Sequence, residues 1–195
     1  MKIAYQGIEG SYSDNCARKK YPDCETISCK TFDEVFTKAN ENENIRAIIP
    51  ESNKTTGNIG VEYLIFKYRL NICAEHFYPI HHHLLGLPGT KLGDIRNVYS
   101  HAQGLSQCSN FIKTNNLVEN VRADTAGSAK YISEKKNKND VAIASKESAK
   151  IYNLDVLASD IADEKENVTR FLILSKKISQ PDYGEQALDI TEMLI

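Results

Sequence analysis

The sequence predicts an α/β protein built of two lobes around a central cleft. Short strand-like runs alternate with amphipathic helical stretches along the whole chain. A long segment at 71–87 is predicted to be extended and can carry the chain from one lobe to another, and a last strand-like run at 170–174 can return to the first lobe. A cleft between two lobes is a natural site for a small molecule.

The first half of the chain alternates predicted strands with predicted helices. The strand-like runs are 2–5, 25–29 and 45–50, and each precedes a stretch with helix-start signals or an amphipathic repeat. Thr31 and Glu34 form a capping box for the helix that follows the second run. The pattern of residues 58–68 predicts a third helix. Residues 71–87 are then expected to form one long extended segment or two strands in series.

The second half repeats this order. The predicted elements are a strand at 97–100, a helix at 101–115, a strand at 120–123, a helix at 125–135, a buried strand at 141–145 and the last strand at 170–174. We therefore expect lobe one to comprise about 1–76 plus 168–176 and lobe two about 77–167. Residues 177–195 are expected to form a C-terminal tail.

Composition limits the classes of partner. The 195 residues carry 24 lysines and arginines against 26 acidic residues, a net charge of −2, so nucleic acid is not an expected partner. The N-terminus reaches Glu9 before an apolar stretch of signal-peptide length can form, and no run approaches ~18 apolar residues, so we expect neither export nor a membrane span. Five cysteines without a CxxC pair indicate reduced thiols, which favours a cytoplasmic protein.

Two strand-to-helix turns carry candidate ligand groups. In GIEGSYS (7–13), Ser11 and the helix-start N–H groups can hold an anion, or the segment can be a glycine turn with an N-cap. Glu51, Ser52 and Asn53, followed by Lys54, lie at the end of a predicted strand, where open α/β sheets bind ligands. The alternative for this second segment is an ordinary turn.

Three further segments stand out. His81, His82 and His83 are consecutive, and because successive side chains of an extended chain alternate faces, hydrogen-bonded imidazoles are favoured over a metal site. In a helix from His101, Gln103 and Gln107 share one face and Ser100 lies at its start, so these groups either orient a polar ligand or face solvent. Thr169 and Arg170 begin the last strand and offer a hydroxyl and a carboxylate-binding fork.

Taken in order, these segments resemble the catalytic domain of the prephenate dehydratase family. The matching motifs are GIEGSYS, PIHHHLL, VYSHAQGLSQC, DTAGSAK, VAIAS and NVTRF, and the resemblance covers about residues 2–176. It implies a periplasmic-binding-protein-like (type II) fold with the active site in the cleft. It also implies a carbon-oxygen lyase that converts prephenate to phenylpyruvate in phenylalanine biosynthesis, needs no cofactor or metal, and forms a homo-oligomer, a dimer or higher.

The resemblance also implies roles for particular residues. Thr169 corresponds to the family's catalytic hydroxyl, and the matching site residues are Asn53, Ser100, Gln107, Arg170 and Phe171. We expect the substrate carboxylates to be held by Arg170 or Lys54. The helix starts that include Ser11 and Thr125 are expected to contribute N–H groups to the same carboxylates. The family's Pro-Ile-Glu-Asn-Ser is replaced by PESNK (50–54), so Ser52 occupies the glutamate position and Glu51 carries a carboxylate displaced by one. Asp124 stands where the family often has serine.

Two alternatives remain open at this point. The chain can be an arogenate dehydratase, in which case Glu51 could pair with the amino group that distinguishes arogenate, or a noncatalytic small-molecule-binding module on the same scaffold. The resemblance leaves about twenty residues for the tail, too few for the regulatory ACT domain that many family members carry. We therefore expect no ACT-type feedback by phenylalanine in this chain.

Overall fold

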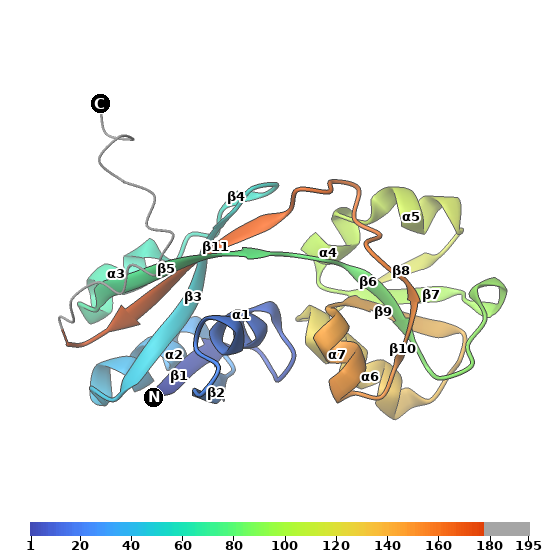
Figure 1. Ribbon diagram of the computed structural model, residues 1–195. Coiled ribbons are helices and arrows are strands. Elements are labelled where there is room, and N and C mark those ends of the chain that lie inside the picture. Colours follow the sequence, from blue (N-terminus) through green and yellow to red (C-terminus); the bar gives the residue numbers. More distant parts are fainter. Residues whose placement is uncertain (178–195) are drawn as a thin grey trace.

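The computed structural model describes residues 1–177, and it has two α/β lobes that lie side by side (Figure 1). The sheet of lobe one contains β1 (Lys2–Gln6), β2 (Glu25–Cys29), β3 (Ile45–Asn53), β4 (Gly57–Asn58), β5 (Asn71–Pro79) and β11 (Val168–Ser175). The sheet of lobe two contains β6 (His83–Gly86), β7 (Asn97–Ser100), β8 (Val118–Val121), β9 (Asp140–Ala144) and β10 (Asp155–Ala158). The predicted two-lobed α/β class is confirmed. All but the first residue of the expected tail lies outside the described residues.

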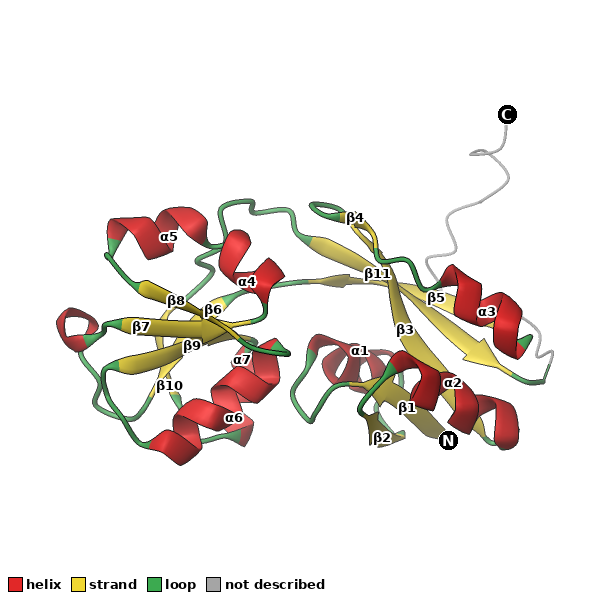
Figure 2. Ribbon diagram, turned by 180° about the vertical axis from the view of Figure 1, so that it is seen from behind, coloured by secondary structure: helices red, strands yellow, loops and turns green. Residues whose placement is uncertain are grey.

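Each sheet mixes parallel and antiparallel strands. The order in lobe one is β2-β1-β3-β11-β5, with β1 to β3 parallel and β11 antiparallel to both of its neighbours. The order in lobe two is β10-β6-β9-β7-β8, in which β7 is parallel to β8 and β9. The parallel strands therefore direct their carboxyl ends, where open α/β sheets place ligands, toward the space between the lobes (Figure 2).

Helices cover both faces of each sheet. They are α1 (Tyr12–Lys20), α2 (Phe32–Glu41), α3 (Glu62–Tyr68), α4 (Ala102–Ser106), α5 (Ser109–Thr114), α6 (Thr125–Lys135) and α7 (Lys146–Ile151), with a short 3-10 helix at Leu92–Asp94. In lobe one, α2 and α3 pack on one face and α1 on the other. In lobe two, α4 and α5 oppose α6 and α7 (Figure 2). None of the helices in residues 1–177 is long and apolar enough to span a membrane.

The chain passes between the lobes twice, at 80–82 and at 159–167. Each crossing bonds to the other: the Ile80 N–H donates to the Asn167 carbonyl at 2.8 Å, and the Ile161 N–H donates to the His82 carbonyl at 2.9 Å. The boundary between the lobes, expected at residue 77, lies slightly later in the structure, because β5 stays paired with β11 up to Pro79.

The predicted strands are present, and 71–87 forms the two strands in series, β5 and β6. The helix predicted at 58–68 begins only at Glu62, because Gly57 and Asn58 pair with β3 as a hairpin. The helix predicted at 101–115 is divided into α4 and α5 at Gln107 and Cys108. The short elements β4, α7 and β10 were not predicted. They contain two to six residues, too few to show a period.

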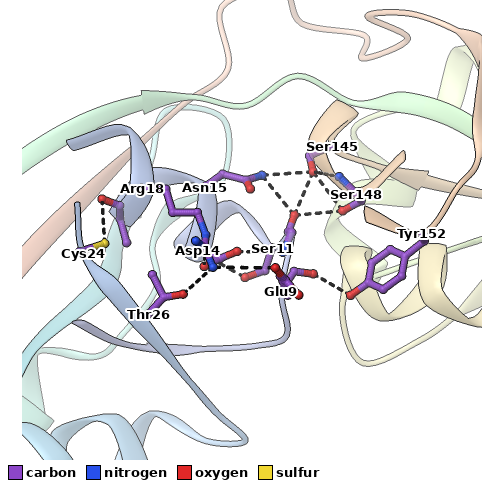
Figure 3. Close-up of polar contacts among 12 residues, drawn as sticks. Glu9, Ser11, Asp14, Asn15, Arg18, Cys24, Thr26, Ser145, Ser148 and Tyr152 are labelled. Carbon is purple, nitrogen blue, oxygen red and sulfur yellow. Dashed lines mark hydrogen bonds and ion pairs between the residues drawn. The ribbon is translucent and has the colours of Figure 1, made fainter. Parts of the chain in front are cut away.

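A buried polar contact joins the two lobes (Figure 3). The carbonyl oxygen of Gly10 accepts hydrogen bonds from the side chains of Asn15 (3.1 Å), Ser145 (2.9 Å) and Ser148 (2.9 Å). Gly10 has a φ of +85°, and an added Cβ would lie 3.0 Å from both Ser148 Oγ and Ile151 Cδ1. Only glycine meets both the backbone and the space requirement here.

We expect Gly10→Ala to lower the free energy of unfolding by about 2–4 kcal/mol, because a left-handed backbone and overpacking each contribute. Urea denaturation of the whole chain measures this loss. Gly60→Ala is the matched control, because Gly60 has a φ of +80° but open space around it, so only about 1–2 kcal/mol should be lost. Equal losses in the two variants would show that α7 does not constrain Gly10.

Candidate active site

A cavity of about 300 Å³ lies between the lobes. Its walls come from the ends of β1, β3 and β11, from the crossing at 80–82, and from the starts of α1, α4 and α6. The lining residues include Ser11, Tyr12, Asn53, His82, Gln103, Gln107, Asp124, Thr125, Thr169 and Phe171. A cavity of this size, with polar groups converging from two lobes, suits a small polar ligand.

Thr169 lies at the base of this cavity, because β11 pairs antiparallel with β3 and places Thr169 opposite Asn53. Thr169 is 6 % exposed, and its Oγ1 accepts a hydrogen bond from Asn53 Nδ2 at 2.8 Å. Within residues 1–177, no group accepts the hydroxyl proton of Thr169. The hydroxyl is therefore held in place with its proton free for a ligand.

The orientation of the Asn53 amide is fixed by a backbone donor. The Thr55 N–H, which can only donate, points to Asn53 Oδ1 at 3.0 Å, and the Thr55 hydroxyl donates to the same oxygen at 2.7 Å. The NH₂ group of Asn53 must then face Thr169 and Asn167, whose Oδ1 it reaches at 2.7 Å. Asn53 is 5 % exposed, so this arrangement is shielded from water.

The two glutamines expected on one helix face both reach across the cleft. Gln107 Nε2 donates to Thr55 Oγ1 at 2.6 Å, and Gln103 Nε2 donates to Thr56 Oγ1 at 2.6 Å. These bonds connect α4, from its first turn at Gln103 to its C-cap Gln107, to the hairpin after β3. They join the Gln107 side chain to the same hydrogen-bonded chain that orients Thr169.

His82 continues this chain. Its Nε2 lies 2.8 Å from Gln107 Oε1, so the neutral ring donates from Nε2, and its Nδ1 lies 2.9 Å from the Tyr12 hydroxyl. Burial lowers the pKa of His82, since an imidazolium would be poorly solvated there. The ring is therefore neutral at pH 7 and positions Gln107.

The other two histidines act at the crossings. His81 Nδ1 lies 2.8 Å from Asp160 Oδ1, and His83 Nδ1 accepts from the Asp160 N–H at 3.3 Å. No cluster of three metal-ligating side chains occurs in the part of the chain that the structure describes. The triplet thus ties 80–82 to 159–167 through hydrogen bonds.

Hydroxyls and helix starts supply the polar groups for an anion. The Ser11 side chain caps α1, accepting from the Asp14 N–H at 3.4 Å, and Thr125 is the first residue of α6. Both line the cavity, together with the positive ends of two helix dipoles. None of the lining residues in the described chain is lysine or arginine. Any carboxylate here would be held by neutral donors.

Arg170 points away from the cavity, and the expectation that it holds a substrate carboxylate does not fit this geometry. Side chains alternate along β11, so Thr169 and Phe171 face the cavity and Arg170 faces the other side. Its guanidinium donates to Glu75 Oε2 at 2.8 Å and to Glu51 Oε2 at 3.4 Å. Ser52 lies on the same side and donates to Glu51 Oε2 at 2.6 Å.

Two other predicted residues also lie outside the cavity lining. Lys54 pairs with the exposed Glu166, so it too does not fit the expected role with a carboxylate. Ser100 is fully buried and donates to the Ile143 carbonyl at 2.8 Å. A Cβ on Gly104 would lie 2.8 Å from Ser100 Oγ, so Ser100 sets how closely α4 approaches β7.

Sequence reasoning did not single out Tyr12, Asn167 or Asp124 as site residues, and it gave His82 no place in the cleft. Tyr12 lies in GIEGSYS, Asp124 in DTAGSAK, and Asn167 begins NVTRF, so the sequence shows where these residues are but not where their side chains point. Asn167 is notable because its Nδ2 is buried without a hydrogen-bond partner next to Thr169. Such a group is costly to leave unpaired.

Comparisons with known proteins show the family to which the chain belongs. A family model described as prephenate dehydratase matches residues 3–179. Arogenate dehydratase 2 of Petunia hybrida is 42 % identical over 178 residues, covering 91 % of this chain and 45 % of its own length. The chain therefore spans less than half the length of this relative.

Two solved structures share the fold. One, described as GqqA, a novel type of quorum quenching acylase, has a TM-score of 0.84 at 33 % identity, over 92 % of this chain and 66 % of its own. The other, a prephenate dehydratase from Arthrobacter aurescens, has a TM-score of 0.85 at 24 % identity, over 94 % and 63 % of the two chains. The second likeness shows the fold alone.

The lowered pKa of His82 predicts acid lability. Because the folded pKa lies below the unfolded value, the unfolded state binds more protons, so stability is full above about pH 6.5 and falls as pH drops below it. Burial also lowers the pKa of His76 and His83, and both groups therefore steepen the fall of stability with decreasing pH. Urea midpoints from about pH 7 to about pH 5.5 should decrease.

In the same pH series, the urea midpoint of His82→Gln should decrease less steeply than that of the wild type, because one group that resists protonation is removed. A His82→Gln slope equal to that of the wild type would show that His82 titrates normally.

Proposed function

The chain belongs to the prephenate dehydratase family, and on that premise we propose that it catalyses the decarboxylating dehydration of a cyclohexadienol such as prephenate. The product from prephenate is phenylpyruvate, and the product from arogenate is phenylalanine. The observation that carries the proposal is the buried Thr169 hydroxyl, fixed by Asn53 with its proton free and directed at a cavity between the lobes.

The reaction needs little from the protein beyond placement and proton delivery. The bond from the ring to its carboxylate breaks and releases CO₂, the electron pair passes into the ring, and the bond to the ring hydroxyl breaks at the opposite end. One proton joins the leaving oxygen to make water, so each turnover consumes one proton. Aromatisation of the ring supplies the driving force without a redox step.

Thr169 is suited to hold the leaving hydroxyl. Its own pKa is too high for a strong acid, so it donates a hydrogen bond and orients the proton transfer to the departing oxygen. The Asn53 amide donates to Thr169 Oγ1 and thereby increases the polarity of the hydroxyl bond. Phe171, next to it on the cavity face, gives the ring an apolar surface.

The lack of lysine and arginine in the described lining suits the departing carboxylate as well. A carboxylate paired with arginine or lysine is stabilised in the ground state, which would oppose its loss as CO₂. The lining offers helix starts at Ser11 and Thr125 but no cation among the described residues. This arrangement can bind the substrate without a strong ion pair to the group that leaves.

An acylase reaction, which the description of one structural relative names, is less well supported. Acyl transfer to a hydroxyl needs a general base within hydrogen-bond reach of the nucleophile. In residues 1–177, the Thr169 hydroxyl contacts the Asn53 amide, which donates to it and cannot take its proton. The geometry favours a hydrogen-bond donor to a leaving group.

Replacing Thr169 by valine, which has the same shape without the hydroxyl, should lower kcat by about 100-fold or more. Thr169→Ser should keep most of the activity, because the hydroxyl remains. Product formation from prephenate and arogenate measures both variants, and thermal unfolding checks that the fold is kept. A wild-type kcat in Thr169→Val would remove Thr169 from the mechanism.

Glu51→Gln tests whether the displaced carboxylate acts on the substrate. Because Glu51 faces Arg170, and Arg170 also pairs with Glu75, we expect kcat and KM to change by no more than about threefold. The same product assay gives both constants. A loss near that of Thr169→Val would instead place the Glu51 carboxylate at the reacting group.

A further inference from the structure

Asp124 is the one carboxylate among the described residues that line the cavity. Its Oδ1 accepts the backbone N–H of Gly127 and so caps α6. Its Oδ2 has no hydrogen-bond partner in the described part of the chain. A negatively charged oxygen with free acceptor capacity therefore borders the proposed substrate site.

Capping does not explain the charge. Serine or asparagine caps a helix about as well as aspartate, since one side-chain oxygen is enough to accept the N–H. The nearby Ser145 fulfils the same role for α7 with a neutral hydroxyl, which accepts from the Ser148 N–H at 3.1 Å. At Asp124, the charge is an additional property of the cavity.

That charge is unfavourable for a substrate that is only anionic. Prephenate carries two carboxylates and no cation, and no lysine or arginine of the described lining would offset the repulsion from Asp124. Arogenate has the same two carboxylates, but an ammonium replaces the keto group of the side chain. An ammonium provides the partner that Asp124 lacks.

Resting on the proposed function, we propose that Asp124 is a specificity-determining residue that accepts the ammonium of the substrate and makes this site prefer arogenate to prephenate. The arrangement of the cavity agrees. Thr169 lines it from lobe one and Asp124 from lobe two. The leaving hydroxyl and the amino-acid side chain are at opposite ends of the substrate ring, so one molecule can contact both residues.

The amino-acid end also matches the start of α6. Thr125 follows Asp124 directly, lines the cavity, and has a side-chain hydroxyl without a partner in the described chain. Its hydroxyl can donate to the carboxylate next to the ammonium. Glu51, the sequence-based candidate for this ammonium, faces Arg170 on the far side of β3 and is not available.

The test is the ratio of kcat/KM for arogenate to kcat/KM for prephenate, measured on the whole chain as phenylalanine and phenylpyruvate formed. The wild type should favour arogenate. Asp124→Asn keeps the cap and removes the charge, so kcat/KM for arogenate should fall about 10- to 100-fold, the range for one lost charge-assisted hydrogen bond. Activity on prephenate should stay constant or rise.

Asp163→Asn is the matched control. Asp163 accepts from the Asn110 N–H at 3.1 Å near the start of α5 and lies outside the lining of this cavity, so the same change in charge should leave the ratio unaltered. Asp124→Ser provides a second cap-preserving variant should the asparagine variant fold poorly. It should shift the ratio in the same direction.

The outcomes separate the two proposals. A wild type that prefers prephenate, or an Asp124→Asn variant that lowers both activities equally, overturns the role of Asp124 and leaves the dehydratase function standing. A wild type that converts neither substrate overturns the proposed function and this inference with it. A ratio that falls in Asp124→Asn but not in Asp163→Asn supports the assignment.

Discussion

The pairing of β11 with β3 is the constraint on which the rest of the molecule depends. It returns the chain from lobe two to the middle of the first sheet, between β3 and β5, and so makes the second crossing between the lobes necessary. The same pairing places Thr169 opposite Asn53. One stretch of antiparallel ladder therefore fixes both the two-lobed shape and the group at the base of the cavity.

From Thr169 and Asn53, a chain of hydrogen bonds with fixed donors and acceptors extends to lobe two. The Thr55 N–H orients Asn53, the Thr55 hydroxyl accepts from Gln107, and Gln107 accepts from His82. Each amide has one possible orientation, because the first donor is a backbone group. Among the described residues, the cavity lining is thus polar yet formally neutral except at Asp124, so a bound ligand meets fixed dipoles rather than mobile charges.

Much of this could be predicted from sequence. The strands, the helix at 125–135 and the common face of Gln103 and Gln107 follow from local periodicity, which depends on near neighbours alone. The direction of Arg170 could not, because it depends on which residues of β3 lie opposite β11. Likewise, His82 lies in a crossing rather than a strand, so no alternation rule assigns its side chain to the cleft.

The register of β3 with β11 also explains how the altered PESNK segment forms an ion pair with Arg170. Thr169 pairs with Asn53, Arg170 with Ser52 and Phe171 with Pro50, so Glu51 is left unpaired as a bulge. Without the bulge, positions 50 and 53 would face opposite sides, yet both line the cavity. The bulge puts two consecutive residues, Glu51 and Ser52, on the Arg170 side, and the Glu51 carboxylate reaches the guanidinium at 3.4 Å.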